Sequence, residues 1–171
     1  MRLRLYTLIF LFVTSATILI STAFSFDKTI DVDYSQLTPT AKRQVDCLAQ
    51  NIYYEAGWEP EQGKVAVAMV TMNRLQQSER FGKDICSVVK QKIKSTCQFS
   101  WVCEGKAGGT NNYVYSQAKE IALYVYANYE NIKDVTKGAL YYHADYVNPR
   151  WKLDKTATIG RHIFYKERDG I

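Results

Sequence analysis

The stretch that decides the fold runs from residue 47 to residue 74, CLAQNIYYEAGWEPEQGKVAVAMVTMNR. It continues an apolar pattern that starts after Thr38, which can cap a helix, and Pro39, which suits the first helical position. Apolar residues then recur three and four positions apart, which predicts a helix with one buried face. These positions are Ala41, Val45, Leu48, Ala49, Ile52, Tyr53 and Ala56. Gly57 is expected to end this helix and Pro60 to open the next.

The second helix contains VAVAMV (65–70), which is apolar on all sides. Such a helix is typical of the middle of a core. A third helix is expected over 113–131, whereas 104–112 is rich in glycine and asparagine and predicts a loop. The segment 87–94 is ambiguous between a short helix and a strand.

Two late segments, GALYYHADYV (138–147) and ATIGRHIFYKE (157–167), are rich in tyrosine and branched residues. This composition favours short strands. The expected fold class is therefore α+β, mainly helical, with a small late β-hairpin or sheet.

The start of the chain predicts export. Arg2 and Arg4 precede an uncharged, largely apolar run over 5–26, and AFSF (23–26) offers cleavage after Ser25. The run also has about the length of a membrane span, so an uncleaved signal anchor stays open. We therefore divide the chain into a signal peptide or anchor (1–25), a short segment (26–37) and one main domain (38–171).

The net charge excludes few classes of function. Removing 1–25 takes Arg2 and Arg4 from 22 basic residues and leaves 20 against 17 acidic residues, a net charge of +3. This mild, scattered excess suits an anionic envelope polymer but does not indicate a nucleic-acid partner. We expect a monomer in the periplasm or cell envelope.

The four cysteines predict two disulfides, because exported thiols oxidise and persist as bridges. Three pairings are possible. We expect Cys97 with Cys103, which are close enough to close a small loop, and Cys47 with Cys86. A zinc site built on these cysteines lacks the usual C-x-x-C spacing, and no metal or cofactor is expected.

Glu55 is the candidate catalytic residue. It follows Ile52 by three positions and Leu48 by seven, so its side chain lies at the edge of the buried face. Burial disfavours the charged carboxylate and raises its pKa, as in glycosidases that protonate a bridging sugar oxygen. The alternative is an ordinary solvated glutamate at a helix end.

Several ordered motifs resemble the SleB/CwlJ-type cell wall hydrolase family, named for the spore-cortex-lytic enzyme. The stretch 47–74 resembles its opening signature, and ICSVVKQ (85–91) and CQFSW (97–101) with VCEGK (102–106) resemble its middle. GALYYHA (138–144), NPRW (148–151) and TIGRHIFY (158–165) resemble its end. The resemblance covers nearly the whole expected domain.

The resemblance implies a lysozyme- or transglycosylase-like domain that cleaves peptidoglycan between N-acetylmuramic acid and N-acetylglucosamine. Family members typically act as lytic transglycosylases and leave a 1,6-anhydro end. The catalytic glutamate of the family motif E-A-R-G-E falls on Glu55, and its second glutamate falls on Glu59. Gly57 and Trp58 stand where the family has arginine and glycine, so the loop after Glu55 is expected to differ.

One carboxyl group can serve this reaction, first as the acid and then as the base. A retaining or inverting hydrolase instead requires a second carboxylate across the sugar. Glu59 is the nearest candidate, but Gly57 and Pro60 interrupt the helix between the two. We expect Glu59 to be structural, favouring the start of the second helix through its dipole.

The expected substrate contacts combine flat aromatic faces with amides that can bind N-acetyl groups. They are Gln98, Tyr142, Trp101, Phe99, Asn73, Tyr54 and Trp58. Core packing is the competing interpretation for the aromatic residues, and more so for Phe99.

Other functions remain open. His143, Asp145 and His162 offer three ligands for a zinc amidase or peptidase of the stem peptide. Cys47 with a histidine offers a cysteine peptidase, although an even cysteine count argues against a free thiol. A muramidase-type hydrolase and an inactive wall-binding domain are further alternatives. Wall remodelling and phage lysis fit the sequence equally.

Overall fold

The computed structural model describes residues 32–168, so the expected signal over 1–25 lies outside the described residues. The helices are η1 (Tyr34–Gln36), α1 (Pro39–Ala56), α2 (Glu61–Leu75), α3 (Ser78–Phe81), α4 (Ile85–Val89), α5 (Ser100–Cys103), α6 (Asn112–Asn128) and η2 (Tyr129–Asn131). The strands are β1 (Lys92–Ile93), β2 (Thr96–Cys97), β3 (Tyr141–Ala144), β4 (Asp154–Ile159) and β5 (His162–Lys166).

Helix α1 begins and ends where the sequence predicts. The Thr38 hydroxyl accepts a hydrogen bond from the backbone amide of Ala41 at 3.2 Å, and Pro39 is the first helical residue. Val45, Leu48 and Ile52 are fully buried on its inner face. The helix ends at Ala56, so Glu55 lies in its last turn.

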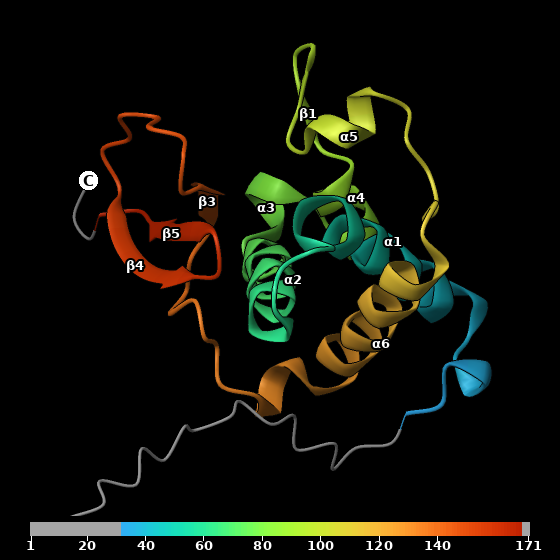
Figure 1. Ribbon diagram of the computed structural model, residues 1–171. Coiled ribbons are helices and arrows are strands. Elements are labelled where there is room, and N and C mark those ends of the chain that lie inside the picture. Colours follow the sequence, from blue (N-terminus) through green and yellow to red (C-terminus); the bar gives the residue numbers. More distant parts are fainter. Residues whose placement is uncertain (1–31, 169–171) are drawn as a thin grey trace, which may run out of the picture.

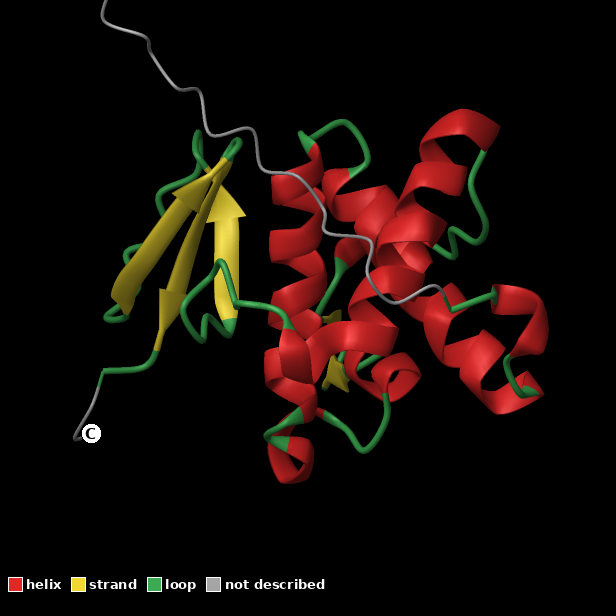
Figure 2. Ribbon diagram, turned by 90° about the horizontal axis from the view of Figure 1, so that it is seen from below, coloured by secondary structure: helices red, strands yellow, loops and turns green. Residues whose placement is uncertain are grey.

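Helix α2 lies between the other helices and the late sheet (Figures 1 and 2). Val65, Ala68, Met69 and Met72 pack into the main helical core. Ala66 and Val70 instead pack against Phe164 of the sheet and Ala139. Because α2 is covered on both sides, its middle is apolar all round, as predicted from VAVAMV.

The late sheet has three antiparallel strands in the order β3-β5-β4. Tyr142 on β3 is paired with Phe164 on β5, and Ile159 on β4 with His162. Gly160 lies in the tight turn between β4 and β5 with a positive φ of 56°, which favours glycine. The fold is therefore α+β and mainly helical with a small sheet.

The ambiguous segment 87–94 contains both kinds of structure, because α4 ends at Val89 and β1 follows at Lys92. The two disulfides have the expected pairing. Cys47–Cys86 joins α1 to α4, and Cys97–Cys103 closes a small loop around α5. The first bridge thus fixes the short helix α4 to the long helix α1, and the second fixes the short helix α5 to β2.

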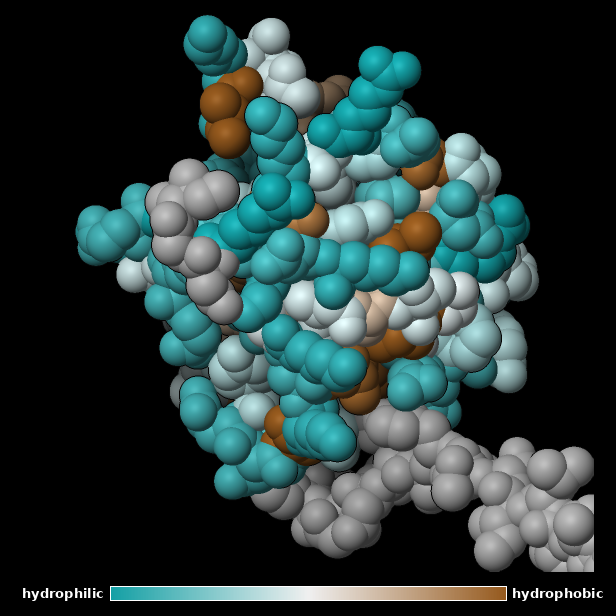
Figure 3. Space-filling view, turned by 90° about the vertical axis from the view of Figure 1, so that its left-hand side faces the viewer, coloured by the Kyte–Doolittle hydropathy of each residue, from teal (hydrophilic) through white to brown (hydrophobic). Residues whose placement is uncertain are grey.

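Among residues 32–168, no helix is both long and apolar enough to cross a membrane. The face on the side of the sheet is largely hydrophilic, and its small hydrophobic patches are separated by polar side chains (Figure 3). This face therefore offers no continuous apolar surface.

Candidate active site

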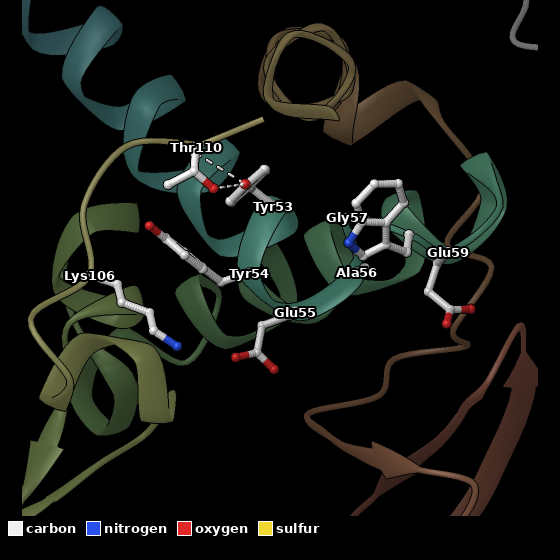
Figure 4. Close-up of a pocket in the computed structure, with 9 residues that line it drawn as sticks. Tyr53, Tyr54, Glu55, Ala56, Gly57, Glu59, Lys106 and Thr110 are labelled. Carbon is white, nitrogen blue, oxygen red and sulfur yellow. Dashed lines mark hydrogen bonds between the residues drawn. The ribbon is translucent and has the colours of Figure 1, made fainter. Parts of the chain in front are cut away.

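Glu55 projects from the last turn of α1 toward the space between the helices and the sheet (Figure 4). The adjoining cleft has a volume of about 460 Å³. It is lined by Tyr53, Tyr54, Glu55, Ala56, Gly57, Trp58, Glu59, Lys106 and Thr110. The end of α1 therefore supplies most of one wall.

The environment of Glu55 favours its protonated form. Burial raises the pKa of this carboxyl above its ordinary value. The hydrogen bond from Tyr142 and the charge of Arg74 oppose that rise, and the charge of Glu104 adds to it. The net direction is upward, which suits a proton donor.

Tyr142 reaches Glu55 from strand β3, across the junction between the helices and the sheet. Its hydroxyl donates to Glu55 Oε2 at 3.1 Å. Burial, with the nearby Glu55 carboxylate, raises the pKa of Tyr142 well above its ordinary value. The phenol therefore stays protonated and can orient one oxygen of the acid.

Arg74 is the residue that the sequence analysis missed. It is 2% exposed, and its Nε donates to the backbone oxygen of Leu140 at 2.8 Å. Its guanidinium lies over the rings of Phe81 and Phe99 at 5.4 and 5.3 Å. Arg74 follows Val70 by four positions on α2, and Val70 faces the sheet. This spacing could have indicated that the Arg74 side chain also lies on that face of the helix.

Glu59 contacts the sheet away from the acid. Its Oε2 accepts a hydrogen bond from the backbone amide of Arg161 at 2.9 Å, in the turn between β4 and β5. Figure 4 shows the Glu59 side chain directed away from that of Glu55. Glu59 thus contacts the β4–β5 turn, whereas the sequence analysis expected it to favour the start of the second helix.

Tyr54 and Trp58 line the cleft, and their contact with substrate stays a prediction. The Tyr54 hydroxyl donates to the backbone oxygen of Gly108 at 2.6 Å, and its ring stacks on Trp101 at 4.8 Å. Trp58 is 83% exposed. One face of the Tyr54 ring is therefore covered by Trp101, whereas most of the Trp58 side chain is exposed to solvent.

Phe99 and Trp101 differ from the expectation that they contact sugar. Each is 4% exposed and packs in the main helical core. The indole nitrogen of Trp101 donates to the buried Asn51 side chain at 3.4 Å. Their aromatic area is used for packing, so we remove both from the substrate contacts.

Asn73 also differs from the expectation of a substrate contact. Its amide nitrogen lies within hydrogen-bonding distance of Asp134, Thr136 and the backbone oxygen of Ala139. Its amide oxygen accepts from the Tyr129 hydroxyl at 3.0 Å. These contacts anchor the segment before β3, which carries Tyr142.

Gln98 is half-buried, and its backbone amide donates to Gln91 at 2.9 Å. Its side-chain contact with substrate stays a prediction.

The two histidines proposed for a zinc enzyme lie on the paired strands β3 and β5, one register position apart, so their side chains point to opposite faces of the sheet. His143 stacks on Tyr165, and its ring nitrogens contact the Ala144 carbonyl and the Tyr165 hydroxyl. His162 lies beside Tyr142 and Phe164. Over residues 32–168, no three histidine, cysteine or carboxylate side chains gather as metal ligands would.

The cysteine peptidase alternative requires a free thiol. Cys47 is bonded to Cys86, and the other two cysteines form the second bridge. Cys47 therefore cannot act as a nucleophile in this structure.

Comparison with known proteins identifies the family. A model described as cell wall hydrolase matches residues 58–165, more than half of the chain. The chain belongs to the cell wall hydrolase family. Glu55 lies just before the matched segment of this cell wall hydrolase domain.

Two curated relatives are similar. The spore cortex-lytic enzyme of Bacillus subtilis (strain 168) is 30% identical over 131 residues, covering 72% of this chain and 38% of the relative. The spore cortex-lytic enzyme of Halalkalibacterium halodurans is 31% identical over 127 residues, covering 70% and 34%. The match therefore spans little more than a third of each relative.

Two solved structures share the fold of this cell wall hydrolase domain. The catalytic domain of the Bacillus cereus SleB protein superposes with a TM-score of 0.59 at 29% identity, covering 73% of this chain and 91% of that domain. The catalytic domain of the germination-specific lytic transglycosylase SleB from Bacillus anthracis gives the same score and identity, with 95% of it covered. The similarity thus extends over nearly the whole of both catalytic domains.

Proposed function

We propose that this domain cleaves the glycan strand of peptidoglycan between N-acetylmuramic acid and N-acetylglucosamine, as a lytic transglycosylase. The observation that carries the proposal is the half-buried Glu55 carboxyl, which lines an open cleft and has a raised pKa. Structural similarity to a germination-specific lytic transglycosylase supports the same reaction.

In the first step, protonated Glu55 donates its proton to the glycosidic oxygen as the bond from muramic acid C1 breaks. Glu55 then accepts the proton of the muramic acid C6 hydroxyl as O6 bonds to C1. The acid is regenerated and no water is consumed. Because Tyr142 engages Oε2, we assign Oε1 to the proton transfers.

The single-carboxylate mechanism is supported by the position of Glu59. Its carboxylate is bound to the Arg161 amide at the β4–β5 turn. Glu104, which influences Glu55 electrostatically, forms an ion pair with Lys106. A hydrolase would require a carboxylate placed across the sugar from Glu55.

The wider assignments are part of the proposal. Residues 38–171 form the catalytic domain, and residues 1–25 export it to the periplasm or cell envelope or anchor it there. The partner is the glycan strand, and the domain acts as a monomer. Both wall remodelling and phage lysis are compatible with this activity.

Mass spectrometry of purified peptidoglycan after digestion tests the proposal. Anhydro-muramyl products from the wild type, and none from Glu55→Gln, are the expected result. Products with reducing muramic acid ends would overturn the transglycosylase step in favour of a muramidase. Cleaved stem peptides with intact glycan would overturn glycan cleavage itself.

A further inference from the structure

Trp58 is unusual because a large apolar side chain is left open to water. It is 83% exposed, more than any other large hydrophobic residue over 32–168. It also lines the cleft that contains Glu55, three positions earlier in the chain. An indole ring carries a large, rigid contact area, and on a cleft wall this open ring face can stack on a bound ligand.

The backbone before Trp58 leaves no room for a side chain at position 57. A Cβ added at Gly57 would lie 2.4 Å from the backbone oxygen of Tyr53 and 3.0 Å from Val114 Cγ1. The end of α1 therefore packs closely on α6 only without a side chain at 57. The departure from the family motif places the large residue at the next, exposed position.

The surroundings of Trp58 favour a carbohydrate ligand. The cleft wall combines the rings of Tyr53 and Tyr54 with the polar side chains of Lys106 and Thr110. A sugar presents both an apolar ring face and hydroxyl groups, whereas a lipid surface would meet charged and polar groups at the same wall.

We propose that Trp58 stacks on a sugar ring of the strand that Glu55 cleaves, and thereby sets the affinity for the glycan. This inference rests on the proposed function. Trp58 would contact a sugar ring and not the bond that breaks. Its contribution is therefore the same in the ground state and in the transition state. Such uniform binding lowers KM and leaves kcat nearly unchanged.

Co-sedimentation with purified, insoluble peptidoglycan tests the proposal in a Glu55→Gln background, where the strand is not consumed. Adding Trp58→Ala is expected to weaken binding about tenfold, and Trp58→Phe to restore part of it. The matched control is Tyr113→Ala, because Tyr113 is 71% exposed but does not line this cleft. It should change binding less than about twofold.

Binding by the Trp58→Ala variant within about twofold of its parent would overturn the inference, as would an equal loss in the Tyr113→Ala control. Glycan binding that stays intact while binding to anionic lipid vesicles is lost would also overturn it. Because Trp58 is exposed, the variant should unfold at the same temperature as its parent.

Kinetics in the active enzyme separate this inference from the proposed function. Trp58→Ala is expected to raise KM about tenfold with kcat retained. A fall in kcat with unchanged KM would overturn the binding role. If Glu55→Gln retained full lysis, the proposed function would fail, whereas an unaffected Trp58→Ala variant would remove only the inference about Trp58.

Discussion

Two glutamates four residues apart both connect the helices to the sheet, and their environments differ. Glu55 is desolvated and accepts a hydrogen bond from the phenol of Tyr142, and its pKa is raised. Glu59 accepts from the backbone amide of Arg161 at a tight turn. One connection holds an acid in an open cleft, and the other holds the sheet in position. The two residues are of the same type, so only their surroundings distinguish the proposed acid from the glutamate that contacts the turn.

The largest expected effect is a difference in activity between variants of the two glutamates. Glu55→Gln removes the transferable proton and should lower the release of soluble glycan fragments about a thousandfold. The matched control is Glu59→Gln, whose amide oxygen can still accept from Arg161, so most activity should remain. Equal losses in the two variants would show that the comparison is wrong.

Tyr142→Phe should have the next largest effect, on the pH dependence of the reaction. The phenol lowers the pKa of Glu55, so its removal should raise that pKa further. Glu55 must be protonated to start the reaction, and activity is lost as the pH rises through its pKa. The alkaline limb of kcat/KM should therefore move to higher pH, with about tenfold lower activity at the optimum.

A purely structural Tyr142 would lower activity without moving this limb. Movement of the limb to lower pH would contradict the assigned hydrogen bond.

Gly160→Ala tests how much the contact between Glu59 and the β4–β5 turn contributes to stability. The residue has a positive φ, and an added Cβ would lie 1.9 Å from Glu59 Oε2. We expect a loss of about 1 to 3 kcal/mol in the free energy of unfolding, measured by denaturant titration. In a Glu59→Ala background the clash is absent, so part of the loss should disappear. An equal loss in both backgrounds would show that backbone strain at position 160, and not the clash with Glu59, causes the whole loss.

Glu59→Gln should have the smallest effect on stability. The half-buried carboxylate accepts one charge-assisted hydrogen bond, and the amide replaces it with a neutral one. Denaturant titration should show a loss of no more than about 1 kcal/mol. A loss of several kcal/mol would mean that the charge of Glu59 itself holds the sheet.

The helices could be predicted because their signals are local. The Thr38–Pro39 start, the apolar spacing of α1 and the all-apolar middle of α2 each specify an element without knowledge of its partners. Glu55 could be proposed because the edge of the buried face can be counted along one helix. The family resemblance then added weight to that residue.

The rest depends on contacts between distant segments. Tyr142 and Glu55 are 87 residues apart, and no spacing predicts their hydrogen bond. Trp101 is buried against Asn51 and Tyr54 of α1, and Phe99 lies beside Arg74 of α2. The burial of Asn73 depends on the segment before β3. Polar and aromatic residues suited to bind sugar are equally suited to these internal contacts, so composition alone could not separate them.

The most direct test of the central claim is the pKa of the Glu55 side chain, measured by carbon NMR titration of the carboxyl groups. The Glu55 signal is assigned by its absence in Glu55→Gln. Desolvation in the cleft predicts a pKa above the ordinary glutamate value of about 4.3. A pKa at or below that value would contradict the account, because Glu55 would then behave as a solvated carboxylate and not as a protonated acid that can donate to the glycosidic oxygen.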